Sequence, residues 1–165
     1  RSREVDAVVF ATGFRVTDFL SHYEIRGLGD RELNQAWQDG AEAYEGISVT
    51  GFPNLFMMLG PNTGLGHNSM VFMMECQAQL IRQALETVEE KDADYLDVKP
   101  AVHRNFNESL RERMVGTVWK SGCQSWYLED DGQNTTLWPG YTFEYWWRTR
   151  EFEESDYRFA GTLPS

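Results

Sequence analysis

The residues with the clearest potential for chemistry lie in a loop from Gly60 to Ser69, which is rich in glycine and small polar side chains. An apolar run precedes this loop, from Asn54 to Leu59, and another follows it from Met70. We interpret the three segments as a buried strand, a loop that lets the backbone approach a ligand, and the start of a helix. Unpaired N–H groups and the positive end of the helix dipole suit such a position to an anion or a cofactor.

Several groups of this stretch could donate hydrogen bonds to a cofactor, namely Asn62, Thr63, Asn68, Ser69 and the backbone N–H of Met70. The alternative for the four polar side chains is that they satisfy the backbone of the loop and cap the helix. Asn68 or Ser69 is a suitable N-cap residue. The alternative for Met70 is that it is only the first core residue of an amphipathic helix.

His67 lies in the same loop and could act as an acid or base near neutral pH. We favour the simpler interpretation, a loop histidine that is tied to the backbone. The two cysteines, Cys76 and Cys123, lie far apart and the histidines are scattered, so the sequence shows no metal-ligand spacing. Because nothing in the sequence resembles a signal peptide, we expect free thiols in a reducing cytoplasm.

Helices and short strands are expected to position the loop. Apolar residues at helical spacing predict a helix from Met70 to Val88, and a second helix is predicted from Pro100 to Met114. Further elements are expected over shorter stretches: a helix over Arg31–Gln38 capped by Asp30, strands over Ile47–Thr50 and Tyr95–Lys99, and a hairpin within Val118–Trp138.

The two ends of the chain have contrasting sequences. The apolar run Val5–Ala11 predicts a strand that is buried on both faces of a parallel sheet. Only about four residues precede it, too few for a parallel partner and its crossover, so we expect the chain to begin partway through a fold. Near the other end, the aromatic run Tyr141–Trp147 is expected to pack on another part of the domain, and the acidic tail Glu151–Ser165 is expected to fray.

Composition limits the classes of function. With 165 residues of which 41% are hydrophobic, the chain is long and apolar enough for one domain with a core. A formal charge of −11 makes nucleic acid and anionic membrane surfaces poor partners. The longest apolar stretch is interrupted by the glycine-rich loop, so no membrane span is expected.

Four segments together resemble a known family. Residues 6–14, which include Ala11-Thr12-Gly13, resemble the ATG segment of two-dinucleotide-domain flavoproteins, and residues 51–62 are similar to the C-terminal FAD segment of class B flavoprotein monooxygenases. Residues 122–127 and 134–140 are also similar to the pattern of one type within this group, the Baeyer–Villiger monooxygenases. The segments follow one another in the order of the family and span residues 5–150.

The resemblance implies an α/β fold, an incomplete FAD/NAD(P)-binding Rossmann-like domain that forms the C-terminal segment of such a flavoprotein. Residues 1–14 would be the return strand linking the NADPH and FAD domains, and residues 15–165 the C-terminal portion of the FAD domain. The two G-x-G-x-x-G motifs, the family fingerprint and the active-site arginine belong upstream and are absent from this sequence. We therefore expect no catalytic residue in this chain and no activity from it alone.

The resemblance also implies chemistry for the complete enzyme. NADPH reduces FAD, O2 adds to the flavin, and the resulting C4a-peroxyflavin attacks a small-molecule substrate, either a ketone carbonyl or a nitrogen or sulfur atom. The loop Gly60–Ser69 should lie along the isoalloxazine, with Met70 N–H near its pyrimidine edge. Thr12 and Gly13 should approach the ribityl or pyrophosphate part of FAD, unless they form a plain turn. The non-enzymatic alternative is a self-associating fragment that binds no flavin.

Overall fold

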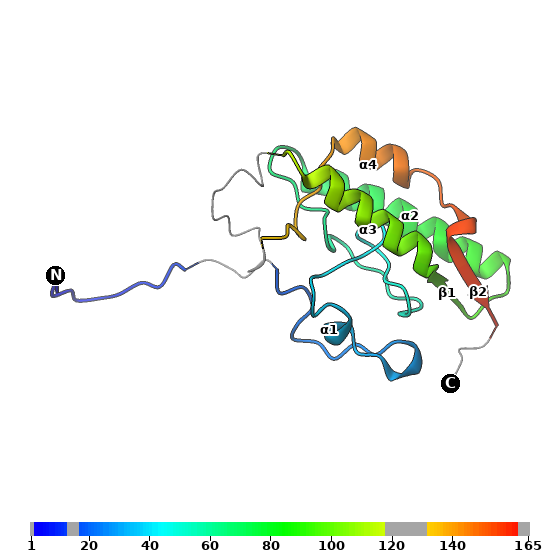
Figure 1. The fold of residues 1–165 in the computed structure, drawn as a ribbon, viewed down its shortest axis with the longest axis horizontal. Helices are drawn as coiled ribbons and strands as arrows, with labels where there is room; N and C mark the ends of the chain where they lie inside the picture. Colours follow the sequence, from blue (N-terminus) through cyan, green and yellow to red (C-terminus); the bar gives the residue numbers. More distant parts are fainter. Residues whose placement is uncertain (1, 13–16, 118–131, 162–165) are drawn as a thin grey trace.

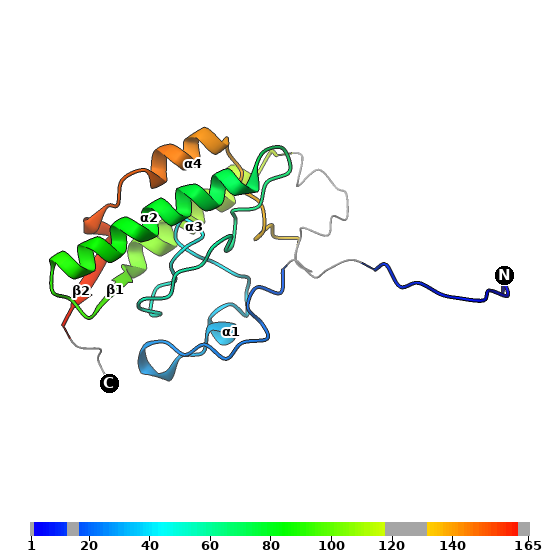
Figure 2. The ribbon, with the colours of Figure 1, turned by 180° about the vertical axis from the view of Figure 1, so that it is seen from behind.

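The computed structural model describes residues 2–12, 17–117 and 132–161. Its regular part is built from two long helices, α2 (Met70–Glu90) and α3 (Pro100–Met114), with a short helix α4 (Thr142–Thr149) packed on α2. Two short strands, β1 (Tyr95–Val98) and β2 (Tyr157–Ala160), pair antiparallel. Figures 1 and 2 show α2 and α3 as neighbouring layers, with the β1–β2 ribbon at one end.

The helices form where their sequences predict them. The apolar stripe of α2 faces the apolar residues that recur every four positions in α3. The buried cluster between α2, α3 and α4 consists of Met73, Cys76, Phe106, Leu110, Trp138 and Tyr145. Pro100 occupies the first turn of α3, where its missing N–H costs no helical hydrogen bond. The strand predicted over Tyr95–Lys99 is confirmed as β1, which carries residues of a second cluster beneath the ribbon.

The C-terminal segment is ordered by pairing, so the prediction of a frayed acidic tail is wrong for residues 151–161. A single turn of 3-10 helix, η3 (Glu154–Asp156), leads into β2. Strand β2 then pairs with β1 so that Tyr157 lies opposite Val98 and Ala160 opposite Tyr95. The remote partner β1 stabilises a segment whose own sequence has little periodicity.

Residues 17–69 contain little regular structure. They include one 3-10 turn, η1 (Leu28–Asp30), and one short helix, α1 (Leu33–Ala36). The helix predicted over residues 31–38 is thus shorter than expected, because Asp30 adopts a left-handed backbone (φ 61°) and Glu32 is still extended. Apolar side chains of this part form a separate cluster, which consists of Leu33, Ala43, Val49, Phe52 and Met57.

The strands predicted over Ile47–Thr50 and Asn54–Leu59 are absent, which corrects both predictions. Asn54 and Leu59 have φ values of 58° and 57°, in the left-handed region that no strand contains. Their N–H groups donate to the carbonyl of Leu96 and to the side chain of Gln77 instead of to a strand ladder. Ile47, Val49 and Met57 are buried without a strand, whereas Met58 is 48% exposed.

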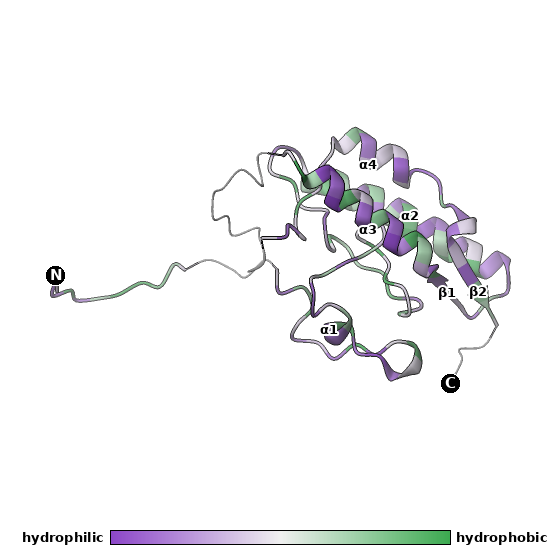
Figure 3. Cartoon of the chain, in the orientation of Figure 1, coloured by the Kyte–Doolittle hydropathy of each residue, from purple (hydrophilic) through white to green (hydrophobic). Residues whose placement is uncertain are grey.

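The strand predicted over Val5–Ala11 is also absent. Residues 2–12 are exposed, Val9 by 87%, and they extend away from the rest of the molecule (Figure 1). Figure 3 shows that this extended segment is largely hydrophobic. No other strand of the described residues lies beside it to pair with its backbone, which is the condition for a strand of a parallel sheet.

The aromatic run Tyr141–Trp147 forms most of α4 and differs from expectation in its burial. Tyr145 is fully buried, but Tyr141, Phe143 and Trp147 are 80%, 66% and 53% exposed. The expected packing of the whole run on the domain is therefore wrong. The predicted hairpin lies mostly outside the described residues, and its last part makes only an isolated parallel bridge, between Leu137 and Gly64.

Among the described residues, no helix combines the length and the hydrophobicity that crossing a membrane requires.

Candidate functional site

The loop Gly60–Ser69 leads directly into the N-terminus of α2. Ser69 caps this helix, since its Oγ accepts a hydrogen bond from Phe72 N–H at 3.4 Å. Asn68 supports the cap from outside: its Oδ1 accepts from Ser69 N–H at 2.7 Å, and its Nδ2 donates to Thr142 Oγ1 in α4 at 2.8 Å. Both side chains therefore satisfy the local structure, and Asn68 also connects α4 to the start of α2.

The first half of the loop is buried and held by a remote segment. Asn62 adopts a left-handed backbone, with φ 56°, and its Nδ2 donates to the carbonyls of Asn134 and Leu137 at 2.8 and 3.1 Å. The backbone adds bonds from Asn62 N–H to Thr135 O and from Gly64 N–H to Thr136 O. The Asn62 side-chain NH2 group therefore already donates two hydrogen bonds within the protein. Any contact of Asn62 with a cofactor would have to use other atoms of this residue.

Thr63 also forms its side-chain hydrogen bond within the loop. Its side chain is 1% exposed, and its Oγ1 donates to the carbonyl of Gly60 at 2.7 Å. A methyl group on Gly46 would overlap Thr63 Cγ2, and one on Gly60 would overlap Gly46 O. The two backbones touch at these glycines because neither has a side chain.

The second half of the loop is open. Residues 66–69 are exposed, Met70 is half-buried and Val71 is 56% exposed. The first turn of α2 contains no acidic side chain that would place a negative charge beside its N–H groups. His67 is exposed, and within the described residues no hydrogen bond ties it to the backbone, so the predicted tie stays a prediction.

The structure therefore brings five of the seven predicted site residues together on one loop and helix start: Asn62, Thr63, Asn68, Ser69 and Met70. Thr12 lies in the exposed N-terminal segment, and Gly13 lies outside the described residues. The first half of the loop is buried, whereas residues 66–69 before the helix start are exposed. Backbone groups near Met70 are consequently the best placed to meet a ligand.

Sequence reasoning missed a buried network behind the loop. Leu59 N–H donates to Gln77 Oε1 at 2.9 Å, Gln77 Nε2 donates to Tyr145 OH at 3.1 Å, and Tyr145 OH donates to Glu45 O at 2.6 Å. The available signal was a glutamine within the apolar stripe of α2, because a polar residue at a core position requires buried partners.

The same network contains a buried ion pair. Glu45 is 3% exposed, and its Oε1 accepts from Arg148 Nε and Nη2 at 2.9 and 2.6 Å. Its Oε2 is buried and has no hydrogen-bond partner. Burial raises the pKa of the Glu45 carboxyl, and the guanidinium of Arg148 opposes this effect. The pair connects α4 to the turn at Glu45 and Gly46, which in turn contacts the loop.

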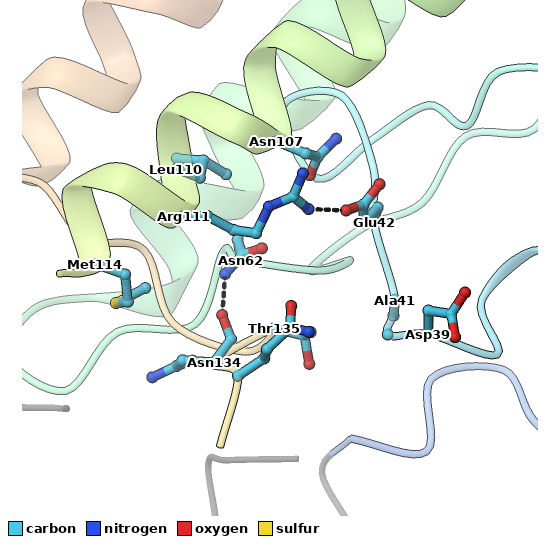
Figure 4. A pocket seen from close by; sticks show the side chains of 12 residues that line it. Asp39, Ala41, Glu42, Asn62, Asn107, Leu110, Arg111, Met114, Asn134 and Thr135 are labelled. Atoms are coloured by element: carbon cyan, nitrogen blue, oxygen red, sulfur yellow. Dashed lines mark hydrogen bonds and ion pairs between the residues drawn. The ribbon is translucent and has the colours of Figure 1, made fainter. Parts of the chain in front are cut away.

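Asn62 also borders a pocket of about 410 Å³ (Figure 4). Arg111 of α3 and Glu42 form an ion pair beside it, and Asn107 lies on the same helix face as Arg111. Figure 4 shows the hydrogen bond from Asn62 to Asn134 at the border of this pocket. Charged and amide side chains line the pocket, and the hydrogen bond between Asn62 and Asn134 lies at its border.

Comparison with known proteins shows which folds and sequences the chain resembles. No protein-family model matches it. The structure of OTEMO in complex with FAD and NADP superimposes on it with a TM-score of 0.81 and 23% sequence identity, over 97% of this chain and 30% of that one. The fold is thus the one that part of this FAD-containing protein adopts, and the predicted fold class, an α/β fragment of a larger protein, is confirmed.

The sequence relatives are more specific. A Baeyer-Villiger monooxygenase of Pseudomonas aeruginosa is 44% identical over 164 residues, 98% of this chain and 31% of the relative. One of Streptomyces coelicolor is 43% identical over 98% of this chain and 32% of the relative. The chain is therefore homologous to a segment of Baeyer–Villiger monooxygenases, as its motifs predicted, and it spans about a third of their length.

Proposed function

We propose that this chain is the C-terminal part of the FAD-binding domain of a Baeyer–Villiger monooxygenase, which uses NADPH and O2 to insert an oxygen atom into a ketone. The homology to relatives of that name supports this assignment. The observation that carries it is the start of α2, where the exposed residues 66–69 follow a glycine-rich loop whose first half is buried. Residues 1–14 would link the NADPH and FAD domains, and residues 15–165 would complete the FAD domain.

The residues present fit a flavin. Its pyrimidine edge offers carbonyl oxygens and becomes anionic on reduction, and a helix N-terminus stabilises such charge by about 0.3–1 kcal/mol. The half-buried Met70 and exposed Val71 provide apolar surface beside these donors. We infer that Met70 N–H meets the pyrimidine edge and that Asn68 and Ser69 hold the cap in place. When bound, FAD supplies the redox and oxygen chemistry.

The other predicted residues take supporting positions in this proposal. Asn62 and Thr63 would contact the cofactor through atoms other than their committed side-chain donors, and they hold the loop that faces the ring. Thr12 and Gly13 would approach the ribityl or pyrophosphate part. No side chain of this segment is proposed to be catalytic. Cys76 is a free, buried thiol, and we propose a reducing cytoplasm as the location of the protein.

The test uses the complete protein that contains this segment. We expect it to be yellow when purified, to oxidise NADPH and to convert a ketone into an ester or lactone. A colourless protein that neither binds added FAD nor oxidises NADPH would contradict the proposal. Mixing the isolated chain with FAD and recording one absorbance spectrum shows whether this segment binds flavin by itself.

A monooxygenase acting on nitrogen or sulfur is the alternative within the class, because the substrate pocket depends on more than this segment. Supplying the complete protein with a ketone and a thioether separates the two activities. Insertion of oxygen into a C–C bond supports the first, and formation of a sulfoxide without an ester supports the second.

A non-enzymatic role is favoured by one observation. Apolar side chains are exposed in two places, the N-terminal segment around Val9 and the α4 face with Phe143 and Trp147. Exposed apolar surface drives association. If the isolated chain acts as a self-associating fragment, light scattering will show oligomers and added FAD will leave its spectrum unchanged. A stable monomer at high concentration would exclude this role.

A further inference from the structure

Gln77 occupies a special place relative to the open helix start. It lies seven residues after Met70 in α2, which places both residues on the same helix face two turns apart. Its side chain is completely buried, with 0% exposure. Both functional groups of the amide are used, the oxygen by Leu59 N–H and the nitrogen by Tyr145 OH.

The hydrogen bond from Leu59 restrains the residue that directly precedes the loop. Leu59 directly precedes Gly60 and has a left-handed backbone with φ 57°, a conformation that a leucine adopts only when its surroundings hold it there. Its N–H points at Gln77 over 2.9 Å. A single side chain therefore connects the residue before the loop to the helix that the loop enters.

The bond to Tyr145 connects the loop to a second support. Tyr145 OH passes the chain of hydrogen bonds to the carbonyl of Glu45 at 2.6 Å. A methyl group added to Gly46, the next residue, would overlap Thr63 Cγ2, and one added to Gly60 would overlap the carbonyl oxygen of Gly46. Gln77 thus closes a ring of contacts around the buried half of the loop.

We propose that Gln77 is a positioning residue that fixes the loop Gly60–Ser69 against α2 and so sets the place of Met70 N–H relative to a bound flavin. The part about flavin rests on the proposed function, whereas the part about the loop does not. An apolar substitution removes the acceptor of Leu59 N–H, and the left-handed turn at Leu59 then loses its restraint. A carboxyl side chain retains that acceptor.

The first experiment measures the loop without a cofactor. Amide hydrogen exchange of the full chain is compared for wild type, Gln77→Leu, Gln77→Glu and the exposed control Gln79→Leu. We expect exchange at residues 59–69 to rise about tenfold in Q77L, the factor that corresponds to one net hydrogen bond. Q79L should stay near wild type, and exchange in Q77E, which keeps the acceptor of Leu59 N–H but loses the amide donor to Tyr145, should rise less than in Q77L. Equal exchange in Q77L and wild type overturns the proposal.

The second experiment measures the flavin in the complete protein. We expect Q77L to shift the visible absorption bands and the midpoint potential of FAD and to weaken FAD binding about tenfold. Q77E, which keeps the acceptor of Leu59 N–H, should restore part of each change, which a merely structural role would not require. Unchanged spectrum and potential in Q77L overturn the link to flavin, whereas a wild-type protein without flavin overturns the proposed function and leaves the exchange result decisive for the loop.

A third variant covers the case in which Q77L does not fold. Tyr145→Phe keeps the aromatic ring that packs against Trp138, with ring centroids 5.1 Å apart, and removes only the hydroxyl between Gln77 and Glu45. We expect faster exchange at Leu59 and a shifted flavin potential, both relative to wild type. Exchange rates equal to those of wild type in Y145F would then overturn the proposal.

Discussion

The helical part of the chain, α2 to α4, and the irregular part, residues 17–69, each enclose a hydrophobic cluster, but their backbones are satisfied in different ways. The helices pair most of their N–H and C=O groups internally. The irregular part depends on side chains from elsewhere: Gly51 N–H donates to Asp97 Oδ1 at 2.8 Å, and Leu59 N–H donates to Gln77. The candidate site lies at the junction of these parts, and its rigidity comes from bonds that cross between them.

The largest effect that would test this comparison is expected at Gly46. Gly46→Ala adds a methyl group that overlaps Thr63 in a backbone with φ 68°, so we expect a loss of about 3 kcal/mol in the free energy of unfolding. The matched control is Gly29→Ala, which has a similar φ of 65° and open space around it, and should cost only about 1 kcal/mol. Urea unfolding of both variants measures the difference. Equal losses would show that the close approach is unimportant.

A smaller effect is expected from the hydrogen bonds between the loop and residues 134–138. Asn62→Ala removes two hydrogen bonds to buried carbonyls and a residue type that tolerates the left-handed region, so we expect a loss of about 2 kcal/mol. Asn105→Ala, at an exposed position of α3, serves as the control and should change stability little. Thermal unfolding monitored by circular dichroism compares them. A loss of stability in N105A as large as in N62A would show that the hydrogen bonds of Asn62 contribute nothing specific.

The buried carboxyl of Glu45 predicts a pH dependence. Its pKa is raised in the folded state by burial, so the folded state binds its proton more tightly than the unfolded state does. The stability contributed by this group is therefore complete below the unfolded pKa of about 4.5 and declines as the pH rises toward the folded pKa, by at most about 1.4 kcal/mol per pH unit.

The measurement is the free energy of unfolding from pH 4 to pH 8 for wild type, Glu45→Gln and Glu75→Gln. We expect E45Q to remove the decline with rising pH, because the amide does not titrate. Glu75 is exposed on α2, so E75Q should follow the wild-type profile. An E45Q profile that matches wild type would assign the pH dependence to other groups.

The smallest effect is expected at the helix cap, which belongs to the locally determined part. Ser69→Ala removes the acceptor of Phe72 N–H and should cost about 0.5–1 kcal/mol. Ser69→Asp keeps a capping oxygen and should retain most of the stability. Chemical denaturation of both variants tests this, and a loss in S69D equal to that in S69A would exclude capping as the cause.

Prediction from sequence succeeded where neighbouring residues decide the structure. The helix after Met70 with Ser69 as a possible cap, the helix from Pro100 and the strand at Tyr95 each follow from local spacing and cap residues. It failed over Asn54–Leu59, because an apolar run shows that residues are buried but not which backbone they adopt. There, hydrogen bonds to Leu96 and Gln77 stabilise turns in place of a strand.

The sequence by itself determined the two long helices, the loop between Gly60 and Ser69, and the kinship with Baeyer–Villiger monooxygenases, because these depend on local periodicity and on short motifs. Only the tertiary structure decided that Asn62 and Thr63 turn inward while the start of α2 stays open. It also decided that Gln77 supports Leu59 from within α2. The physical reason is that buried polar groups take whichever partner the fold brings near, and such partners lie far away in the sequence.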